Sequence, residues 1–131
     1  MPLLGVIFLK VKIFAVALLF LLIGAAVLNT TFLTRGIDRI TESVRALEIG
    51  EPIEDTEAEA RDLYEDYRRW EKFFSLTVNH RDLTDVESLF SEMLGYLGVS
   101  DADGARVAKS RLIDALSHLR RLSGFNIGSV F

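Results

Sequence analysis

The chain has 131 residues, half of them hydrophobic, with fifteen Lys and Arg against nineteen Asp and Glu and a formal net charge of −4. It has no cysteine, which excludes disulfides, thiolate metal ligands and a cysteine nucleophile. Because every acidic residue follows residue 33, the later part of the chain is acidic, and we expect no nucleic-acid partner, since such binding depends on Lys and Arg neutralising phosphate.

Residues 13–33 form an uncharged, mostly apolar run directly after Lys10 and Lys12. As a helix rising about 1.5 Å per residue this run is roughly 31 Å long, close to the thickness of the hydrocarbon core of a bilayer. We therefore predict a transmembrane anchor over residues 13–33 that contacts the lipid bilayer, after a short basic N-terminal tail over residues 1–12. A signal peptide cleaved after Ala26 is the alternative, but the apolar character continues beyond that point.

The charges flanking the anchor bear on its orientation. Lys10 and Lys12 precede it, whereas Arg35, Arg39 and Arg45 follow it, so the positive-inside tally is nearly even. The two lysines lie tight against the apolar run, which favours an N-terminus inside the cell. We expect a single-pass protein of the cell membrane whose helical domain is extracytoplasmic.

Beyond the anchor, apolar residues at spacings of three and four predict amphipathic helices. The anchor is expected to continue into the first of these, which Gly50 and Pro52 end. Its apolar stripe is Leu33, Ile37, Ile40, Val44 and Leu47. The stripe of the second helix is Ala60, Leu63, Tyr67, Trp70, Phe74 and Thr77. We expect this second helix to contribute most to the core.

Two more helices follow. The third is predicted to begin at Asp82 or Thr84, because Thr84 and Glu87 have the spacing of a capping box, and Gly98 ends it. Ser100 is the predicted N-cap of the fourth. The stripe of this fourth helix is Ala105, Ala108, Leu112, Ala115, Leu119 and Leu122.

Short connections between such helices favour antiparallel neighbours. The predicted fold is therefore all-α, with the N-terminal transmembrane helix running into an antiparallel up-and-down bundle of about four helices. The bundle domain is expected over residues 34–124, followed by an apolar C-terminal tail over residues 125–131. The heptad spacing of the first helix also raises the possibility of a homodimer through its stripe.

Few residues point to chemistry. His80 and His118 are the only histidines, and a metal site would need them to meet Asp82 or Glu87. Their spacing fixes no such site, so we predict no metal, no cofactor and no catalytic residue, and we do not expect an enzyme. The carboxylates of the second helix alternate with basic residues at helical spacing and predict a salt-bridged surface.

The aromatic residues of the second helix allow two interpretations. They can form a recognition surface, since Trp and Tyr are common in binding hot spots, or they can pack in the core. The apolar stripe favours the core. The residues are Tyr64, Tyr67, Trp70, Phe73 and Phe74.

The order of these features resembles a family of small membrane-anchored proteins of unknown function from spore-forming and related Gram-positive bacteria. The matching segments are Trp70-Glu71-Lys72, then His80, the helix over 83–97 and Phe125-Asn126-Ile127. The chain departs from the family pattern by ending Gly128-Ser129-Val130-Phe131. The resemblance implies a single-pass protein with a helical domain and no catalytic residues.

We predict that the helical domain is a protein-interaction or scaffold module at the membrane surface, with a membrane or envelope protein as partner. The alternative is an extracytoplasmic domain that binds or senses a small ligand, which needs a pocket with converging polar groups. The predicted interaction surface consists of Leu76, Leu89, Leu94, Phe125 and Phe131, with Val107 as a further apolar residue off the main stripes.

Overall fold

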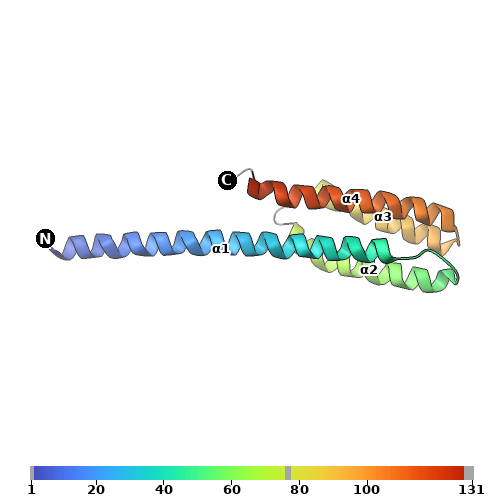
Figure 1. Cartoon of the computed structure of the whole chain (residues 1–131), viewed down its shortest axis with the longest axis horizontal. Helices are drawn as coiled ribbons and strands as arrows, with labels where there is room; N and C mark the ends of the chain where they lie inside the picture. The colour runs from blue at the N-terminus through green and yellow to red at the C-terminus, as the bar shows by residue number, and fades with distance from the viewer. Residues whose placement is uncertain (1, 76–77, 129–131) are drawn as a thin grey trace. The chain divides into compact units, whose positions relative to one another are not determined.

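The computed structural model describes residues 2–75 and 78–128, with side chains for all of these except residues 2, 30, 74 and 123–128. All regular secondary structure in this part of the chain is helical, and the predicted all-α fold is confirmed (Figure 1). The helices are α1 (Pro2–Ala46), α2 (Ile53–Phe74), α3 (His80–Gly98) and α4 (Ala102–Gly128). Leu76 and Thr77 lie outside the described residues.

The chain divides into two compact units, Met1–Phe32 and Leu33–Phe131. The first contains only helix, and the described side chains over residues 3–29 are exposed. It belongs to the one described helix that is long and apolar enough to cross a membrane. Residues 2–12, which the sequence assigned to a basic tail, are already helical.

The second unit is an antiparallel up-and-down bundle of four helices, as predicted. It consists of the last part of α1 together with α2, α3 and α4, and consecutive helices run in opposite directions (Figure 1). Helix α4 continues to Gly128, so residues 125–128 extend the last helix.

Large apolar side chains fill the centre of the bundle. The largest fully buried ones are Tyr67, Phe90, Ile37, Leu83, Met93, Leu97, Leu112, Leu116 and Leu119. Helices α3 and α4 each bury five hydrophobic residues, whereas α2 buries only Ile53, Ala60 and Tyr67. The expectation that the second helix contributes most to the core is therefore wrong, because its remaining described apolar side chains lie at the edge of the bundle.

The backbones of α3 and α4 approach most closely, followed by those of α2 and α3. Ala105 and Ala108 are fully buried, and such small side chains allow close packing. Leu116 is also buried on α4, although it is absent from the predicted stripe, while Ala115 and Leu122 are half-buried.

Two predicted helix starts are wrong, that of α3 by two or four residues and that of α4 by one. Helix α3 begins at His80, where the Asn79 side chain accepts a hydrogen bond from the backbone N–H of Arg81 at 3.1 Å, as an N-cap does. Thr84 instead lies within the helix. Before α4, the carboxylate of Asp101 accepts from the N–H of Gly104 at 2.9 Å, whereas Ser100 has a positive φ of 57°.

Helices α1 and α2 meet where Trp70 packs against Gly36. A Cβ atom at Gly36 would lie 2.8 Å from two ring atoms of Trp70, which is closer than real contacts allow. Helix α1 continues through Gly36, and the missing side chain makes room for the indole.

Candidate functional site

The connection between α1 and α2 is held by side chains. Lys109 of α4 donates to the carbonyl oxygens of Arg45 at 3.1 Å and Leu47 at 2.6 Å, and Arg106 donates to that of Ile49 at 3.2 Å. The hydroxyl of Thr56 lies within 3.4 Å of the Glu48 carbonyl and 3.2 Å of the Gly50 carbonyl. Lys109 and Arg106 thus provide hydrogen-bond donors and positive charge to backbone carbonyls at the C-terminal end of α1, which is the negative end of its helix dipole. Together with Thr56 they order the connection.

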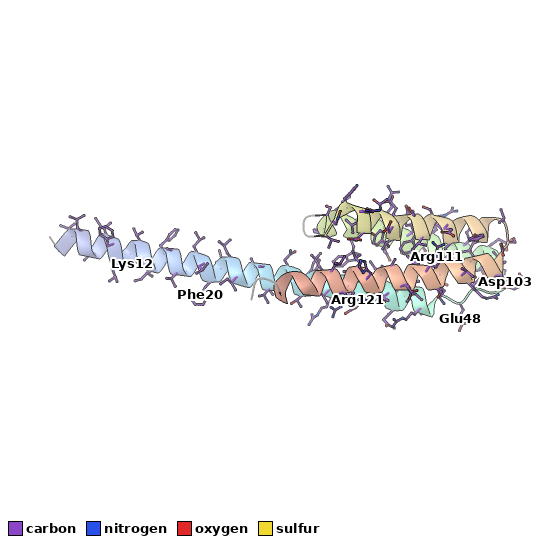
Figure 2. The ribbon with its side chains drawn as sticks, turned by 90° about the horizontal axis from the view of Figure 1, so that it is seen from above. Lys12, Phe20, Glu48, Asp103, Arg111 and Arg121 are labelled. Atoms are coloured by element: carbon purple, nitrogen blue, oxygen red, sulfur yellow. The ribbon has the colours of Figure 1, made fainter. Side chains whose placement is uncertain are left out.

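Beside this ordered connection lies the acidic groove, which we define by Glu48, Glu51, Asp55, Glu59 and Asp62. It comprises two adjoining hollows of about 500 and 300 Å³ that share Glu59 and Asp62. Ser43 and Ala46 of α1 line the smaller hollow, together with Leu47 of the connection. Figure 2 shows Glu48 at the same end of the bundle as Asp103, where the α1–α2 and α3–α4 connections lie.

Among the residues that the structure describes, no Lys or Arg lines either hollow. Within the described residues, none of the five carboxylates of the acidic groove forms an ion pair. On the outer face of α2, by contrast, Arg61 pairs with Glu57 at 2.9 Å and Arg69 with Asp66 at 2.8 Å. The predicted salt-bridged surface therefore holds for these pairs, while the acidic groove keeps its negative charge.

A second groove, between α1 and α4, has a different charge pattern. It has a volume of about 260 Å³ and is lined by Asp38, Glu42, Arg45, Arg120 and Arg121, together with Thr41 and Ser117. Arg120 pairs with Asp38 and Arg45 pairs with Glu42, each at 3.0 Å. Because its charges are largely balanced, this groove offers less attraction to a charged partner.

A pair of carboxyl groups, Glu71 and Glu87, lies between α2 and α3. Partial burial raises the pKa of Glu71, and the negative charge of Glu87 and a hydrogen bond with it raise that pKa further. Glu87 also accepts from the Tyr64 hydroxyl at 3.2 Å, and Arg68 lies over the Tyr64 ring. This arrangement favours the protonated form of Glu71 relative to a free glutamate.

The histidines do not assemble a metal site. His118 lies 3.8 Å from Asp82 and is exposed, and His80 is the exposed first residue of α3. Among the described residues, no group of three His, Asp or Glu side chains is arranged to hold a metal ion.

The predicted interaction residues fall into three groups. Leu89 and Leu94 are half-buried and pack against the core, so only part of each side chain is accessible. Val107 is 61% exposed. Leu76, Phe131 and the side chain of Phe125 lie outside the described residues. The proposed role of these residues stays a prediction.

The aromatic cluster is mostly part of the core. Tyr67 is fully buried, its hydroxyl donates to the Leu83 carbonyl at 3.0 Å, and burial raises its pKa. The Tyr64 and Tyr67 rings lie 5.3 and 5.4 Å from that of Phe90. Only Phe73 is half-exposed, and the side chain of Phe74 lies outside the described residues. The cluster is therefore a poor candidate for a recognition surface.

The apolar stripe of the first helix, suggested as a homodimer interface, packs inside the bundle of the same chain. Leu33, Ile37, Ile40, Val44 and Leu47 are all buried in the bundle core. A second copy therefore has no access to this stripe while the bundle is closed.

Sequence reasoning missed the acidic groove because its carboxylates come from two elements. Asp55, Glu59 and Asp62 recur at spacings of four and three on α2, but Glu48 and Glu51 belong to the connection that precedes it. A signal was present: these three α2 residues have acidic rather than basic neighbours at helical spacing.

Comparison of the chain with protein-family models, curated proteins and solved structures finds no match. The resemblance to the Gram-positive membrane-anchored family accordingly stays a prediction.

Proposed function

We propose that this protein is a single-pass, membrane-anchored interaction module without enzymatic activity, whose bundle binds a protein partner through the acidic groove. The observation that carries the proposal is the set of five unpaired carboxylates along an ordered concave surface. The partner surface that fits is a segment rich in Lys and Arg.

The groove has two properties that favour binding. Its connection is fixed by Lys109, Arg106 and Thr56, so little conformational entropy is lost when a partner binds. In the described part of the chain no ion pair neutralises its carboxylates, and charge complementarity accelerates association with a positive partner.

The long apolar helix supports the other half of the proposal. It confines the bundle to a membrane surface, where a membrane or envelope protein is the expected partner. The lysines beside the apolar run favour the N-terminus inside the cell and the bundle outside.

The test is photocrosslinking of the full chain in its native membrane. A photoreactive residue replaces Glu59 in the acidic groove, and a matched one replaces the exposed Asp114 of α4. We expect the residue at position 59 to capture one reproducible protein through a basic segment, and the residue at position 114 to capture none.

Charge reversal provides the specificity control. Glu59→Lys with Asp62→Lys is expected to abolish capture, measured with a photoreactive residue at Glu48, whereas Asp114→Lys is expected to leave it unchanged. Equal capture at both positions, or capture that survives reversal, would contradict the assignment of the groove.

A further inference from the structure

The charges of the bundle are unevenly distributed along its length. Contacts between helices, among them Trp70 on Gly36 and the ion pair of Arg120 with Asp38, show which residues lie near the level of Leu33, the first residue of the bundle unit. The half of the bundle at this level, here called the near half, has eight basic and five acidic residues. The rest of the bundle up to residue 122, the far half, has five basic and fourteen acidic residues. The near half consists of residues 33–40, 66–75, 80–85 and 117–122.

Most cations of the near half are not neutralised by ion pairs. Arg120 pairs with Asp38 and Arg69 pairs with Asp66. Within the part of the chain that the structure describes, five other cations of this half form no ion pair, and all five are exposed. These five, here called the basic end, come from all four helices and are Arg35, Arg39, Lys72, Arg81 and Arg121. The acidic net charge of the chain therefore conceals one basic end.

Chain connection keeps the basic end close to the membrane. Leu33 is both the last residue of the predicted span and the first residue of the bundle unit. Gly36, which Trp70 contacts, lies only about 5 Å further along α1. Trp70 is half-buried beside Phe73, which is 51% exposed, and Trp is common at membrane–water interfaces. Beyond Arg121 the sequence has no Asp or Glu that would repel anionic headgroups.

The far half lies too far along the bundle to cancel the attraction of the basic end. Ala46, beside the acidic groove, is roughly 20 Å along α1 from Leu33. Charges in water are screened over about 8 Å at physiological ionic strength. Figure 2 shows Arg121 toward the opposite end of the bundle from Glu48 and Asp103. When the basic end faces the headgroups, the carboxylates of the groove are therefore about two screening lengths or more away from them.

We propose that the basic end binds anionic phospholipids of the leaflet from which α1 emerges, and so holds the bundle with its acidic groove directed away from the membrane. Each Lys or Arg near an anionic surface strengthens binding roughly fivefold. Repulsion between the same lipids and the acidic groove favours the same orientation, which leaves the groove open to a protein partner. The inference rests on the membrane-anchoring part of the proposed function.

The absence of native cysteines makes a direct test possible. Single variants Ser75→Cys, Val99→Cys and Phe20→Cys of the full chain are labelled with a small fluorophore and reconstituted in vesicles of phosphatidylcholine and phosphatidylglycerol at 3:1. Ser75 is exposed directly after α2 in the near half, whereas Val99 is exposed directly after α3 in the far half. Quenching is measured with iodide in water and with either lipid carrying a nitroxide near its glycerol.

We expect the Phe20 label to be shielded from iodide by the bilayer. The Ser75 label should be quenched more by nitroxide-labelled phosphatidylglycerol than by nitroxide-labelled phosphatidylcholine. The Val99 label should be quenched by iodide and by neither lipid. Sodium chloride at about 1 M should remove the preference at Ser75, because the screening length then falls to about 3 Å.

Substitution of two cations tests the basic end itself. Lys72→Gln with Arg121→Gln should lower the enrichment of phosphatidylglycerol around the Ser75 label by up to about fivefold for each cation. Arg61→Gln with Arg111→Gln is the matched control, because it removes the same charge from exposed positions of the far half. This control should leave the enrichment unchanged.

Three outcomes would overturn the inference. Equal quenching of the Ser75 label by the two lipids, with Phe20 shielded from iodide, rejects the basic end and leaves the anchor standing. Lipid quenching of the Val99 label as strong as that of the Ser75 label shows that the bundle lies along the membrane. A Phe20 label open to iodide removes the anchor and the inference together. None of these results depends on a partner of the acidic groove, whose capture by crosslinking is a separate test.

Discussion

The two sides of the bundle are built differently. Helices α3 and α4 pack with closely spaced backbones through buried apolar side chains, including Ala105 and Ala108. Helix α1 also buries apolar side chains such as Ile37 and Val44 in the core, but its backbone lies less close to those of its neighbours. Individual contacts add to this packing, such as Trp70 on Gly36 and Lys109 on the carbonyls of Arg45 and Leu47. The grooves described above all lie along α1 or α2.

The two sides therefore have different roles: one contributes mainly to stability, and the other exposes charged side chains. The α3–α4 side removes apolar area from water, which is the largest favourable contribution to folding. The α1–α2 side leaves hollows in which carboxylates stay solvated without a partner. Mutations on the two sides should therefore differ in the size of their effect on stability.

The largest effect is expected at the centre of the α3–α4 side. Leu112→Ala removes a fully buried side chain and should lower the free energy of unfolding by about 2–5 kcal/mol. Leu63→Ala, at a half-buried position beside the acidic groove, should cost about 1 kcal/mol. Denaturant unfolding followed by fluorescence of the single Trp measures both, and equal losses would contradict the comparison.

The next effect is expected where α1 meets α2. Gly36→Ala places a methyl group against the Trp70 ring and should destabilise the bundle by about 1–3 kcal/mol through overpacking. Trp70 emission should also shift, because the indole must move.

Gly95→Ala on α3 is the matched control, since nothing lies within 4 Å of a Cβ there. Its higher helix propensity should raise stability by about 0.5–1 kcal/mol. If Gly36→Ala also stabilised the chain, the close approach of Trp70 to α1 would be wrong.

A smaller effect is expected at the cation that binds the end of α1. Lys109→Met keeps most of the aliphatic stem but loses the hydrogen bonds to Arg45 and Leu47, at a cost of about 1–2 kcal/mol. Amide hydrogen exchange over residues 47–52 should accelerate, whereas Lys72→Met on the exposed face of α2 should leave it unchanged. Unaltered exchange in both variants would show that the connection is ordered without Lys109.

The smallest effect is expected from the carboxyl pair. Burial and Glu87 raise the pKa of Glu71 above its ordinary value of 4.5, so the folded chain binds this proton more tightly than the unfolded chain. The resulting stabilisation is present at low pH and is lost as pH rises through the raised pKa.

Glu71→Gln should remove this part of the pH dependence and raise stability slightly at pH 7. Thermal unfolding between pH 4.5 and 8 measures it, with Glu65→Gln on the exposed face of α2 as a control of equal charge. A Glu71→Gln variant that keeps the pH slope of the parent chain would rule out the raised pKa of Glu71.

The sequence predicts the helices well because helical periodicity is a local property. The stripe Leu33, Ile37, Ile40, Val44 and Leu47 is buried as its spacing predicts. Helix starts were harder to predict, because Asn79 and Asp101 compete with Thr84 and Ser100 for the same capping role. Each is a good N-cap residue, and only the path of the chain selects between them.

Whether the carboxylates of the acidic groove are paired was beyond sequence reasoning for a different reason. Whether Glu59 is paired depends on which side chains of other elements reach it, and that is a property of the folded bundle. Two basic residues of α4, Arg106 and Lys109, donate to backbone carbonyls at the end of α1 and in the α1–α2 connection. Counting charges along the chain cannot reveal that these cations bind carbonyls there and form no ion pair with the carboxylates of the groove.

The hydrogen bonds from Lys109 to the end of α1 also bear on how the protein is made. Leu47 and Lys109 are 62 positions apart, so at about 5–20 residues per second the ribosome adds the lysine roughly 3–12 s after the leucine. During that interval the buried face of α1 has no fourth helix to cover it. The buried face of α1 can therefore be covered fully only after the last helix has been synthesised. Until then this face needs protection from non-native contacts.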